Sequence, residues 1–506
     1  MNQEVFVKMD NICKSFGSVK ANHLVNFEVN KGEVHALLGE NGAGKSTLMN
    51  MLSGFYKPDS GSIFIRGKEV KFNSPKDAIN EKIGMIHQHY KLIDVQTAKE
   101  NIILGQKGKF FINNKQLSKK IEDIAKDYGL PINPNKKIYD MSIGEKQSVE
   151  ILKVLYEGTD ILIMDEPTAV LTPQETKKLF KIIRNMASNG CAIIIITHKL
   201  NEVMEVSDRV TVLRKGRTIT TVITKETSPK LLTNLMVGKS VNLSINRPDL
   251  VRQNEILKIE NLTALNHDKV KVLNNINFSL YGGEILGIAG VANSGQKEIC
   301  EAIAGLYPID SGKILYESEN IVGNSPAEII KKGISMSFIP EDRLGMGLVA
   351  SMNMVDNYLL KEFHNQKGIF INRKPIKKIC TNMIENLEIV TPSVNHPVKQ
   401  LSGGNIQKVL IGREINTNPK ILITAYAVRG LDISSAHTIY DLINEQKNKG
   451  VAILFIGEDL DVLIELCDKI LVLSEGAVMG IVDARNTTKE VIGHLMAGGA
   501  HHKEAY

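Results

Sequence analysis

Residues 39 to 47 read GENGAGKST, and this stretch decides the fold. It follows an aliphatic run, VHALL at 34 to 38, and it precedes a helical pattern with Leu48, Met51 and Leu52 on one face. A buried strand, a loop of the form G-x-x-x-x-G-K-[ST] and a helix define the phosphate-binding loop of an α/β nucleotide domain. Its glycines let successive backbone N–H groups and the helix N-terminus point at a phosphate.

The ligand expected at this loop is ATP with Mg²⁺. Lys45 is expected to bridge the β- and γ-phosphates, and the Ser46 hydroxyl to bind Mg²⁺. The residues expected to touch the nucleotide here are Gly39, Glu40, Asn41, Gly42, Ala43, Gly44, Lys45, Ser46 and Thr47.

A pair of acids follows a second aliphatic run, ILIMDEPT at 161 to 168. Asp165 falls at the carboxyl end of the expected strand, where a parallel sheet presents groups to ligands, so we expect it to hold the Mg²⁺ water shell. Glu166 is placed to orient and deprotonate the attacking water. Such a pair alone often marks only a solvated turn, and its position in a phosphate-loop domain favours catalysis.

The chain is an internal duplication. MSIGEKQ at 141 returns as LSGGNIQ at 401 and LMVG at 235 as LMAG at 495, both at an offset of 260 residues. Near the start of each copy the offset is 251, because KGEVHALLGE at 31 pairs with GGEILGIAGV at 282. The difference predicts about nine inserted residues between 312 and 401. We expect a first domain over residues 1–246, a linker over 247–254 and a second domain over 255–506.

The second copy lacks most of the chemistry of the first. Its loop, GVANSGQKE at 290 to 298, keeps Gly290 and Gly295 but has Gln296 at the lysine position and Lys297 at the hydroxyl position. Ala425 and Tyr426 replace the two acids in ILITAYAV at 421 to 428. A tyrosine hydroxyl, with an ordinary pKa near 10, is a poor base at neutral pH. We expect no hydrolysis in this copy; whether Lys297 turns back to serve a bound nucleotide stays open.

Within each copy, short runs that are aliphatic on both faces alternate with helical patterns, which predicts a mostly parallel sheet flanked by helices. Residues 90 to 140 and 345 to 400 carry longer helical patterns and predict a helical subdomain in each copy. The net charge of +6 comes from scattered lysines, so we expect a solvated surface and no nucleic-acid partner. The five cysteines have no paired spacing, which indicates reduced thiols. The start, MNQEVFVKMD, and the short apolar runs predict no signal peptide and no membrane span.

The segment MSIGEKQSVEILK, followed by LIMDEPT, resembles the ABC-type ATPases over essentially the whole chain, in two halves. The resemblance implies two tandem RecA-like P-loop domains, each with an antiparallel β subdomain and an α-helical subdomain. It implies that Gln88 senses the γ-phosphate and binds Mg²⁺, that His198 contacts the γ-phosphate, and that Phe16 stacks on adenine. Glu458 stands in the second copy where the first has His198, which places a negative charge near the γ-phosphate.

In this family two domains pair head to tail, so the resemblance implies that each site combines parts of both copies. Site one would join the first copy's loop to Ser402, Gly403 and Gly404, and all its parts are present. Site two would join the second copy's loop to Ser142 and Gly144, and it is degenerate. This pattern explains why the second copy keeps LSGG while losing groups that only its own site would use.

The phrases PEDR at 340 to 343 and RGLD at 429 to 432 resemble the simple-sugar and nucleoside importer ATPases, most closely the nucleoside branch. Glu341 would take the place of Gln88. Members of that family commonly keep acids where Ala425 and Tyr426 stand here. The resemblance implies a peripheral subunit on the cytoplasmic face of the cell membrane, two membrane permease partners and an extracellular substrate-binding lipoprotein. The alternative is a soluble tandem ABC ATPase acting on ribosomes or another assembly, but such proteins usually have a long charged linker and two intact sites.

Overall fold

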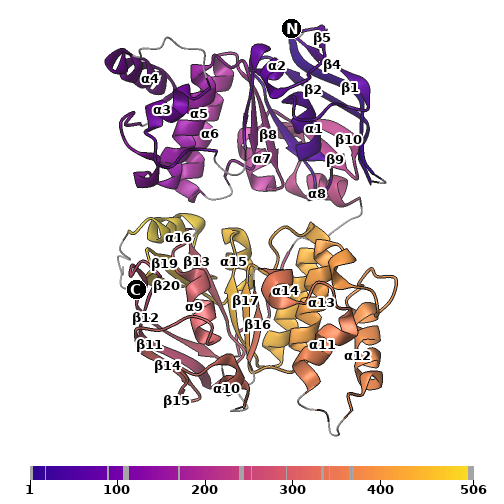
Figure 1. The fold of residues 1–506 in the computed structure, drawn as a ribbon, viewed down its shortest axis with the longest axis vertical. Helices are drawn as coiled ribbons and strands as arrows, with labels where there is room; N and C mark the ends of the chain where they lie inside the picture. The colour runs from indigo at the N-terminus through magenta and orange to yellow at the C-terminus, as the bar shows by residue number, and fades with distance from the viewer. Residues whose placement is uncertain are drawn as a thin grey trace. The chain divides into compact units, whose positions relative to one another are not determined.

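The computed structural model describes residues 4–17, 19–87, 91–105, 113–130, 132–168, 171–238, 244–251, 253–291, 293–331, 336–340, 342–363, 366 and 370–499. The chain divides into two compact units, residues 1–242 and 243–506. Each unit has its own sheets and its own cores, and we describe them in turn (Figure 1).

The first unit alternates strands and helices after an initial hairpin. Its elements, in chain order, are β1 (Val5–Phe16), β2 (Val19–Asn30), β3 (Val34–Leu38), α1 (Lys45–Leu52), β4 (Ser60–Ile65), β5 (Lys68–Val70), α2 (Pro75–Asn80), β6 (Ile83–Ile86), α3 (Ala98–Ile103), α4 (Asn114–Tyr128), η1 (Ile138–Asp140), α5 (Ile143–Tyr156), β7 (Ile161–Asp165), α6 (Pro173–Ser188), β8 (Ala192–Thr197), α7 (Leu200–Val206), β9 (Arg209–Arg214), β10 (Arg217–Ile223), η2 (Thr224–Glu226) and α8 (Pro229–Val237).

Two sheets build this unit. A six-stranded sheet has the order β10-β9-β3-β8-β7-β6 and is parallel except for the β9–β10 pair. A four-stranded antiparallel sheet has the order β2-β1-β4-β5. Helices α3 to α6 gather at one end of the unit and the antiparallel strands at the other (Figure 1). The phosphate loop leaves the carboxyl end of β3, a central strand, which is where parallel sheets place ligands.

The central strands β3, β7 and β8 of the six-stranded sheet are buried on both faces, as their unbroken aliphatic runs predict, whereas the edge strand β10 is partly exposed. One face of β7 and β8 packs with β1, β2 and α1 into one core, and the other face packs with α3 to α6 into a second. Helix α6 begins at a capping box, in which Thr172 Oγ1 accepts from Glu175 N at 3.3 Å and Pro173 occupies the first turn. The expectation of a mostly parallel sheet covered by helices is confirmed for this unit.

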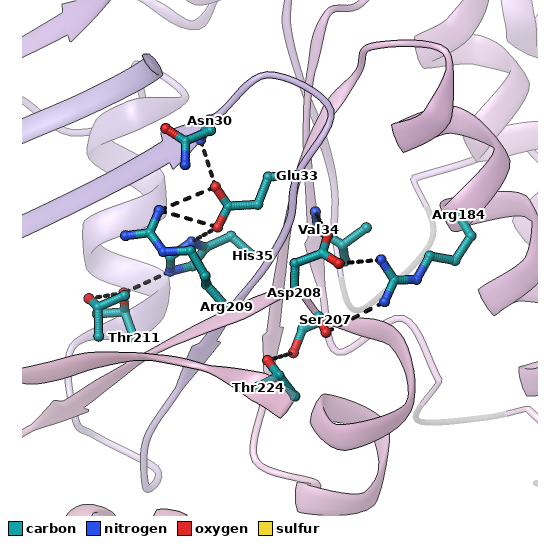
Figure 2. Close-up of polar contacts among 11 residues, drawn as sticks. Asn30, Glu33, Val34, His35, Arg184, Ser207, Asp208, Arg209, Thr211 and Thr224 are labelled. Atoms are coloured by element: carbon teal, nitrogen blue, oxygen red, sulfur yellow. Dashed lines mark hydrogen bonds and ion pairs between the residues drawn. The ribbon is translucent and has the colours of Figure 1, made fainter. Parts of the chain in front are cut away.

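A polar network, buried around Glu33 and His35 and exposed around Arg184, fixes the start of β3, the strand that leads into the phosphate loop (Figure 2). Asp208 Oδ2 accepts from Val34 N at 2.9 Å, and its Oδ1 pairs with Arg184 at 2.7 Å. On the other side, His35 lies between Glu33, at 2.7 Å from Nδ1, and Thr211, at 2.7 Å from Nε2. Because buried polar groups need partners, this network sets the register of β3 against β9.

The second unit repeats the pattern. Its elements are β11 (Glu255–Leu265), β12 (Lys271–Tyr281), β13 (Ile285–Gly290), α9 (Gln296–Ile303), β14 (Ser311–Tyr316), β15 (Glu319–Asn320), α10 (Pro326–Lys331), β16 (Met336–Ile339), the π-helix η3 (Arg343–Gly347), α11 (Met354–Glu362), α12 (Arg373–Asn386), η5 (Val398–Gln400), α13 (Gly403–Ile415), β17 (Ile421–Ala425), α14 (Ile433–Asn448), β18 (Ala452–Ile456), α15 (Leu460–Leu466), β19 (Lys469–Ser474), β20 (Ala477–Asp483) and α16 (Lys489–Met496). The sheet orders, β12-β11-β14-β15 and β16-β17-β18-β13-β19-β20, match those of the first unit.

Strand registers locate the residues inserted in the second copy. In the first unit Ile86 pairs with Met164, and in the second Ile339 pairs with Thr424, so the offset at this strand is 253. An isolated bridge joins Thr97 to Lys137 in the first unit and Asn353 to Pro397 in the second. The offset between the copies is therefore 256 at Asn353 and 260 at Pro397. Three of the extra residues therefore fall between β16 and Asn353, where η3 forms. A π-helix is a usual way to accommodate inserted residues and often lies at functional sites.

The boundary between the units falls four residues before the boundary expected from sequence. Ile245 packs against the core of the second unit, and Arg247 donates to the carbonyl oxygens of Ile464 and Cys467. Lys447 Nζ donates to Pro248 O at 2.8 Å, and Arg485 pairs with Asp249 at 2.8 Å. Residues 247–249 of the expected linker are therefore bound to the surface of the second unit.

Candidate functional site

The phosphate loop of the first unit depends on two glycines. Gly44 is the N-cap of α1 with φ of 97°, a left-handed conformation that favours glycine. A Cβ on Gly44 would lie 2.3 Å from Ala21 O, and one on Gly39 would lie 2.4 Å from Leu213 O. The loop is therefore pressed onto the backbone of β2 and β9, which holds its N–H groups in place.

Lys45 is buried against the loop that it serves. Its Nζ donates to Gly39 O at 2.6 Å and to Glu40 O at 3.0 Å. Burial lowers the pKa of the Lys45 ammonium, while the charges of Glu166 and Asp165 oppose that shift. The ammonium therefore stays close to two carboxylates at the place where the loop would receive phosphate.

Ser46 and Asp165 bring together two oxygens that could hold a metal ion. Ser46 Oγ lies 3.4 Å from Asp165 Oδ2. Neighbouring ligands in an octahedral Mg²⁺ shell, bound at about 2.1 Å, are about 3 Å apart, so this pair fits the ion with little movement. Burial, and then the charge of Glu166, raise the pKa of the Asp165 carboxyl, which is the expected effect of a buried acid whose surroundings favour a cation. The remaining ligands would be water and phosphate oxygens.

Glu166 follows β7 in a strained conformation with φ of 46°. Its N–H donates to Ile196 O at 2.9 Å, which directs the side chain toward the end of β8. There His198 Nδ1 lies 2.8 Å from Glu166 Oε1. This hydrogen bond is the main cause that lowers the pKa of the Glu166 carboxyl, whereas that of Asp165 is raised. Two neighbouring acids with opposite shifts suit two roles, a base and a metal ligand.

Phe16 ends β1 at the tip of the β1–β2 hairpin and is 45% exposed. Tyr56 meets it edge to face at 5.4 Å, and the Lys14 ammonium lies 5.7 Å from its ring centre. An exposed ring held by two neighbours suits stacking by a base.

Gln88, expected to sense the γ-phosphate, lies outside the described residues, two positions beyond the end of β6. Glu341, its expected counterpart, also lies outside them, two positions beyond β16.

The two signature segments begin helices. Ser142 is the N-cap of α5 and accepts from Glu145 N at 3.3 Å; Ser402 is the N-cap of α13, and its Oγ accepts from Asn405 Nδ2 at 2.8 Å. A Cβ on Gly144 would lie 2.8 Å from Glu175 Oε1 and one on Gly404 2.8 Å from Ser435 Oγ. Ser402 and Gly403 are exposed, so their donors face outward from the second unit.

The second unit keeps the backbone of the site. Gly295 is the N-cap of α9 with φ of 101°, against 97° for Gly44. Tyr426 has φ of 54°, and its N–H donates to Ile456 O at 3.1 Å, as Glu166 does to Ile196. At these two positions the copies therefore share a backbone conformation, although the side chain differs at the second.

Gln296 is a neutral substitute for the lysine. Its Nε2 donates to Val291 O at 2.9 Å, in the place of the Lys45 bond to Glu40, and its Oε1 accepts from Ser294 N at 3.0 Å. Gln296 thus preserves the loop without providing charge. Lys297 Nζ lies 3.7 Å from Glu301 Oε1, on the same helix, and this ion pair holds it to one side.

Mg²⁺ does not fit the second copy's donor set. Lys297 and Ala425 stand where the first copy has its hydroxyl and its carboxylate, and an ammonium repels a cation. Beside them is a cavity of about 270 Å³, which is lined by Lys297, Glu301, Phe338, Pro340, Asp342, Met346, Ala425 and Tyr426. Asp342 uses its carboxylate to cap η3, accepting from Gly345 N at 2.8 Å.

Glu458, the residue at the position of His198, has a cationic partner in the second unit. Its Oε1 lies 3.1 Å from Arg429 Nε, so the guanidinium offsets the carboxylate. Arg429 also lies 5.9 Å from the ring centre of Tyr426. Sequence reasoning assigned no role to Arg429, Glu301 or Tyr56. The signal for Arg429 was its place in RGLD, directly after the altered strand end.

The fold and the site together define a P-loop ATPase with two nucleotide-binding domains in one chain. A family model described as "ABC transporter" matches residues 23–169 and again residues 273–424. The chain belongs to the ABC transporter ATP-binding family, which hydrolyses ATP to drive transport, and both of its halves are ABC ATPase domains.

Similar proteins match the chain over its whole length. It is 42% identical to the guanosine import ATP-binding protein NupO of Bacillus subtilis, over 99% of both chains. It is 40% identical to the nucleoside import ATP-binding protein NupA of Lactococcus lactis, again over 99% of both. It is 36% identical to the glucose import ATP-binding protein TsgD13 of Haloferax volcanii, over 99% of this chain and 97% of that one. In the described part of the chain, none of the helices combines the length and apolarity that crossing a membrane requires.

Proposed function

We propose that this chain is the ATP-hydrolysing subunit of an importer that carries nucleosides, and that it has one hydrolytic site. The observation that carries the proposal is the contrast between the two copies. The first brings Lys45 and Ser46 of its phosphate loop together with Asp165, Glu166 and His198 from the ends of β7 and β8, and the second retains the loop's backbone without these groups.

In site one, Glu166 accepts a proton from water as the water oxygen bonds to the γ-phosphorus and the bond to the β-phosphate oxygen breaks, which yields ADP and phosphate. Its lowered pKa keeps the carboxylate ionised, so that it can orient the water and accept its proton, although a lower pKa also makes it a weaker base. His198 holds the Glu166 carboxylate in position, and Lys45 stabilises the γ-phosphate oxygens. Ser46, Asp165 and Gln88 are the residues that would hold Mg²⁺, which, when bound, neutralises charge on the β- and γ-phosphates.

Site one is completed, in this proposal, by the second copy's signature. Ser402, Gly403 and Gly404 would donate to the far side of the γ-phosphate in a head-to-tail arrangement, and the exposure of Ser402 and Gly403 leaves these two available for it. Ser142 and Gly144 would face the second copy's loop. ATP favours the closed arrangement because it binds both copies there, and hydrolysis removes that differential affinity.

The partners are two membrane permease subunits and, through them, an extracellular substrate-binding lipoprotein, with this chain at the cytoplasmic face of the membrane. Support comes from exposed apolar side chains beside the helical subdomain of the first unit. Val95 is 72% exposed and Tyr139 56%, and Ile93 and Leu104 are exposed as well. Tyr139 N donates to Asp94 O, so these side chains belong to adjoining segments. Such a group suits a protein interface.

Nucleosides are the favoured solute because the relatives that carry guanosine or nucleosides in their names are more similar to this chain than the glucose import protein. Simple sugars are the second candidate. The solute specificity would lie in the permease and the binding protein. A role on ribosomes is disfavoured because residues 247–249 bind to the second unit and the described residues 244–251 form no helix.

Uptake of labelled nucleosides, compared with labelled ribose and galactose, tests the solute. Cells that lack this protein should lose nucleoside uptake, and the wild-type chain should restore it while Glu166→Gln should not. Unchanged nucleoside uptake with lost sugar uptake would favour the second candidate. Unchanged uptake of all of them would contradict the importer.

A further inference from the structure

Equivalent backbone hydrogen bonds hold the phosphate loop in both copies. In the first, Gly216 N donates to Ala43 O at 3.1 Å, and His23 N donates to Gly216 O at 2.7 Å. In the second, Gly476 N donates to Ser294 O at 3.2 Å, and the corresponding bond to Gly476 O comes from Asn274 N at 2.8 Å. The backbone hydrogen bonds beneath the loop are therefore the same in the two copies. They do not account for a side chain that differs between the copies at this place.

Asn22 is such a difference. It lies on β2 beneath the loop, is 1% exposed, and its Nδ2 donates to Gly44 O at 3.2 Å. The second copy has Leu273 at this place, also fully buried. A Cβ on Gly44 would lie 2.8 Å from Asn22 Nδ2, and one on Gly295 would lie 3.0 Å from Leu273 Cδ2. The two side chains therefore occupy equivalent positions against equivalent glycines.

The amide is not needed for the fold. With leucine in its place the second copy forms the same left-handed cap, and Ile299 N still donates to Gly295 O at 3.0 Å, as Leu48 N does to Gly44 O. The amide also has a cost, because Asn22 Oδ1 is buried with no hydrogen-bond partner among the described residues. A buried polar atom without a partner destabilises a protein, and such groups in native structures call for an explanation by function.

We propose that Asn22 is a positioning residue that orients the phosphate loop of the working copy; this inference rests on the proposed hydrolytic role of site one. The peptide that contains the Gly44 carbonyl also contains the Lys45 N–H, and a peptide is planar. Holding the carbonyl from below therefore directs this N–H away from β2, into the cradle that receives the phosphate. The second copy does not hydrolyse ATP in this account, so it has no use for the amide.

The test is Asn22→Leu, which gives the first copy the residue of the second. The lost hydrogen bond orients a group that touches phosphate in both the ground state and the transition state. The KM for ATP should therefore rise about three- to tenfold, with kcat within about twofold of wild type. Thermal unfolding should occur at the same or a higher temperature, because the buried amide oxygen is removed and Gly44 O keeps its bond from Leu48 N. The matched control, Leu273→Asn, should leave the KM unchanged.

An unchanged KM in Asn22→Leu would overturn the inference, whether or not the variant unfolds at a lower temperature. So would a rise in KM of the same size in Leu273→Asn. The proposed function is judged separately, by Glu166→Gln in the same preparation. If Glu166→Gln stops hydrolysis while Asn22→Leu matches wild type, only the role of Asn22 is lost; if Glu166→Gln hydrolyses normally, site one itself is wrong.

Discussion

Replacing the acid at the end of β7, and separately the tyrosine at the end of β17, tests the difference between the two copies. In the wild-type chain Glu166 Oε1 lies 2.8 Å from His198 Nδ1. Glu166→Gln keeps the shape of the side chain and an oxygen that can accept from His198, but it removes the carboxylate that would take the proton from water. Tyr426→Phe removes only a hydroxyl from the equivalent position, where the backbone has the same left-handed conformation.

The loss of a general base lowers the rate by about 10²- to 10⁴-fold, which raises the activation barrier by about 3 to 5 kcal/mol. The effect on folding should be much smaller. The pair with His198 is partly exposed, so the free energy of unfolding should change by about 1 kcal/mol or less. We expect kcat to fall by this large factor in Glu166→Gln and to stay within about twofold in Tyr426→Phe.

The assay is steady-state phosphate release by the full chain at saturating ATP and Mg²⁺, with thermal unfolding of each variant as the control for folding. More than about a tenth of wild-type activity in a folded Glu166→Gln would refute the role of this carboxylate. A comparable loss in Tyr426→Phe would show that the second copy also turns over.

Other perturbations give separate checks. Ser402→Ala should lower ATP hydrolysis by about 10²-fold, and Ser142→Ala by no more than about threefold. Each serine is a helix N-cap, so each variant should lose about 1 kcal/mol of stability. Equal losses of hydrolysis would contradict the pairing of each phosphate loop with the signature of the other copy. Gly44→Ala should lower the free energy of unfolding in urea by more than about 3 kcal/mol, because its Cβ would meet a backbone carbonyl oxygen. Gly42→Ala should lower it by only about 1 to 2 kcal/mol, because nothing lies within 4 Å of a Cβ there. Equal losses would refute the close approach at Gly44. Burial lowers the pKa of His35 below 6.5, so below about that pH the unfolded chain binds a proton that the folded chain excludes, and stability is lost as the pH falls. His35→Leu should flatten the urea midpoint between about pH 5.5 and 7.5, and an unchanged slope would refute this assignment.

The duplication and the fold around the phosphate loop were predictable because their signals are local. A strand, a glycine loop and a helix follow one another directly around residue 45, and the hydrophobic runs show which strands are buried. The fold class is confirmed in both halves. The sequence offsets of 251 and 260 show how many residues are inserted in the second copy. Only the strand registers show where along the chain these residues lie, because the helices in that region have no sequence match to align.

The parts that sequence missed depend on contacts between distant residues. Arg429 and Glu458 are on separate segments, and their pairing follows from the adjacent strands β17 and β18. The positions of Pro248 and Asp249 depend on Lys447 and Arg485, which stand 199 and 236 residues later in the chain. Asn22 has no motif around it, and its importance emerges only when its contact with Gly44 is compared with that of Leu273.

The central claim is that one of the two copies hydrolyses ATP, and a single-turnover experiment tests it most directly. The full chain is loaded with radiolabelled ATP, Mg²⁺ is added with excess unlabelled ATP, and the labelled ADP formed per chain is counted. We predict at most one ADP per chain, with none in Glu166→Gln and any second labelled nucleotide recovered as ATP. Two ADP per chain, or one that persists in Glu166→Gln, would contradict the account.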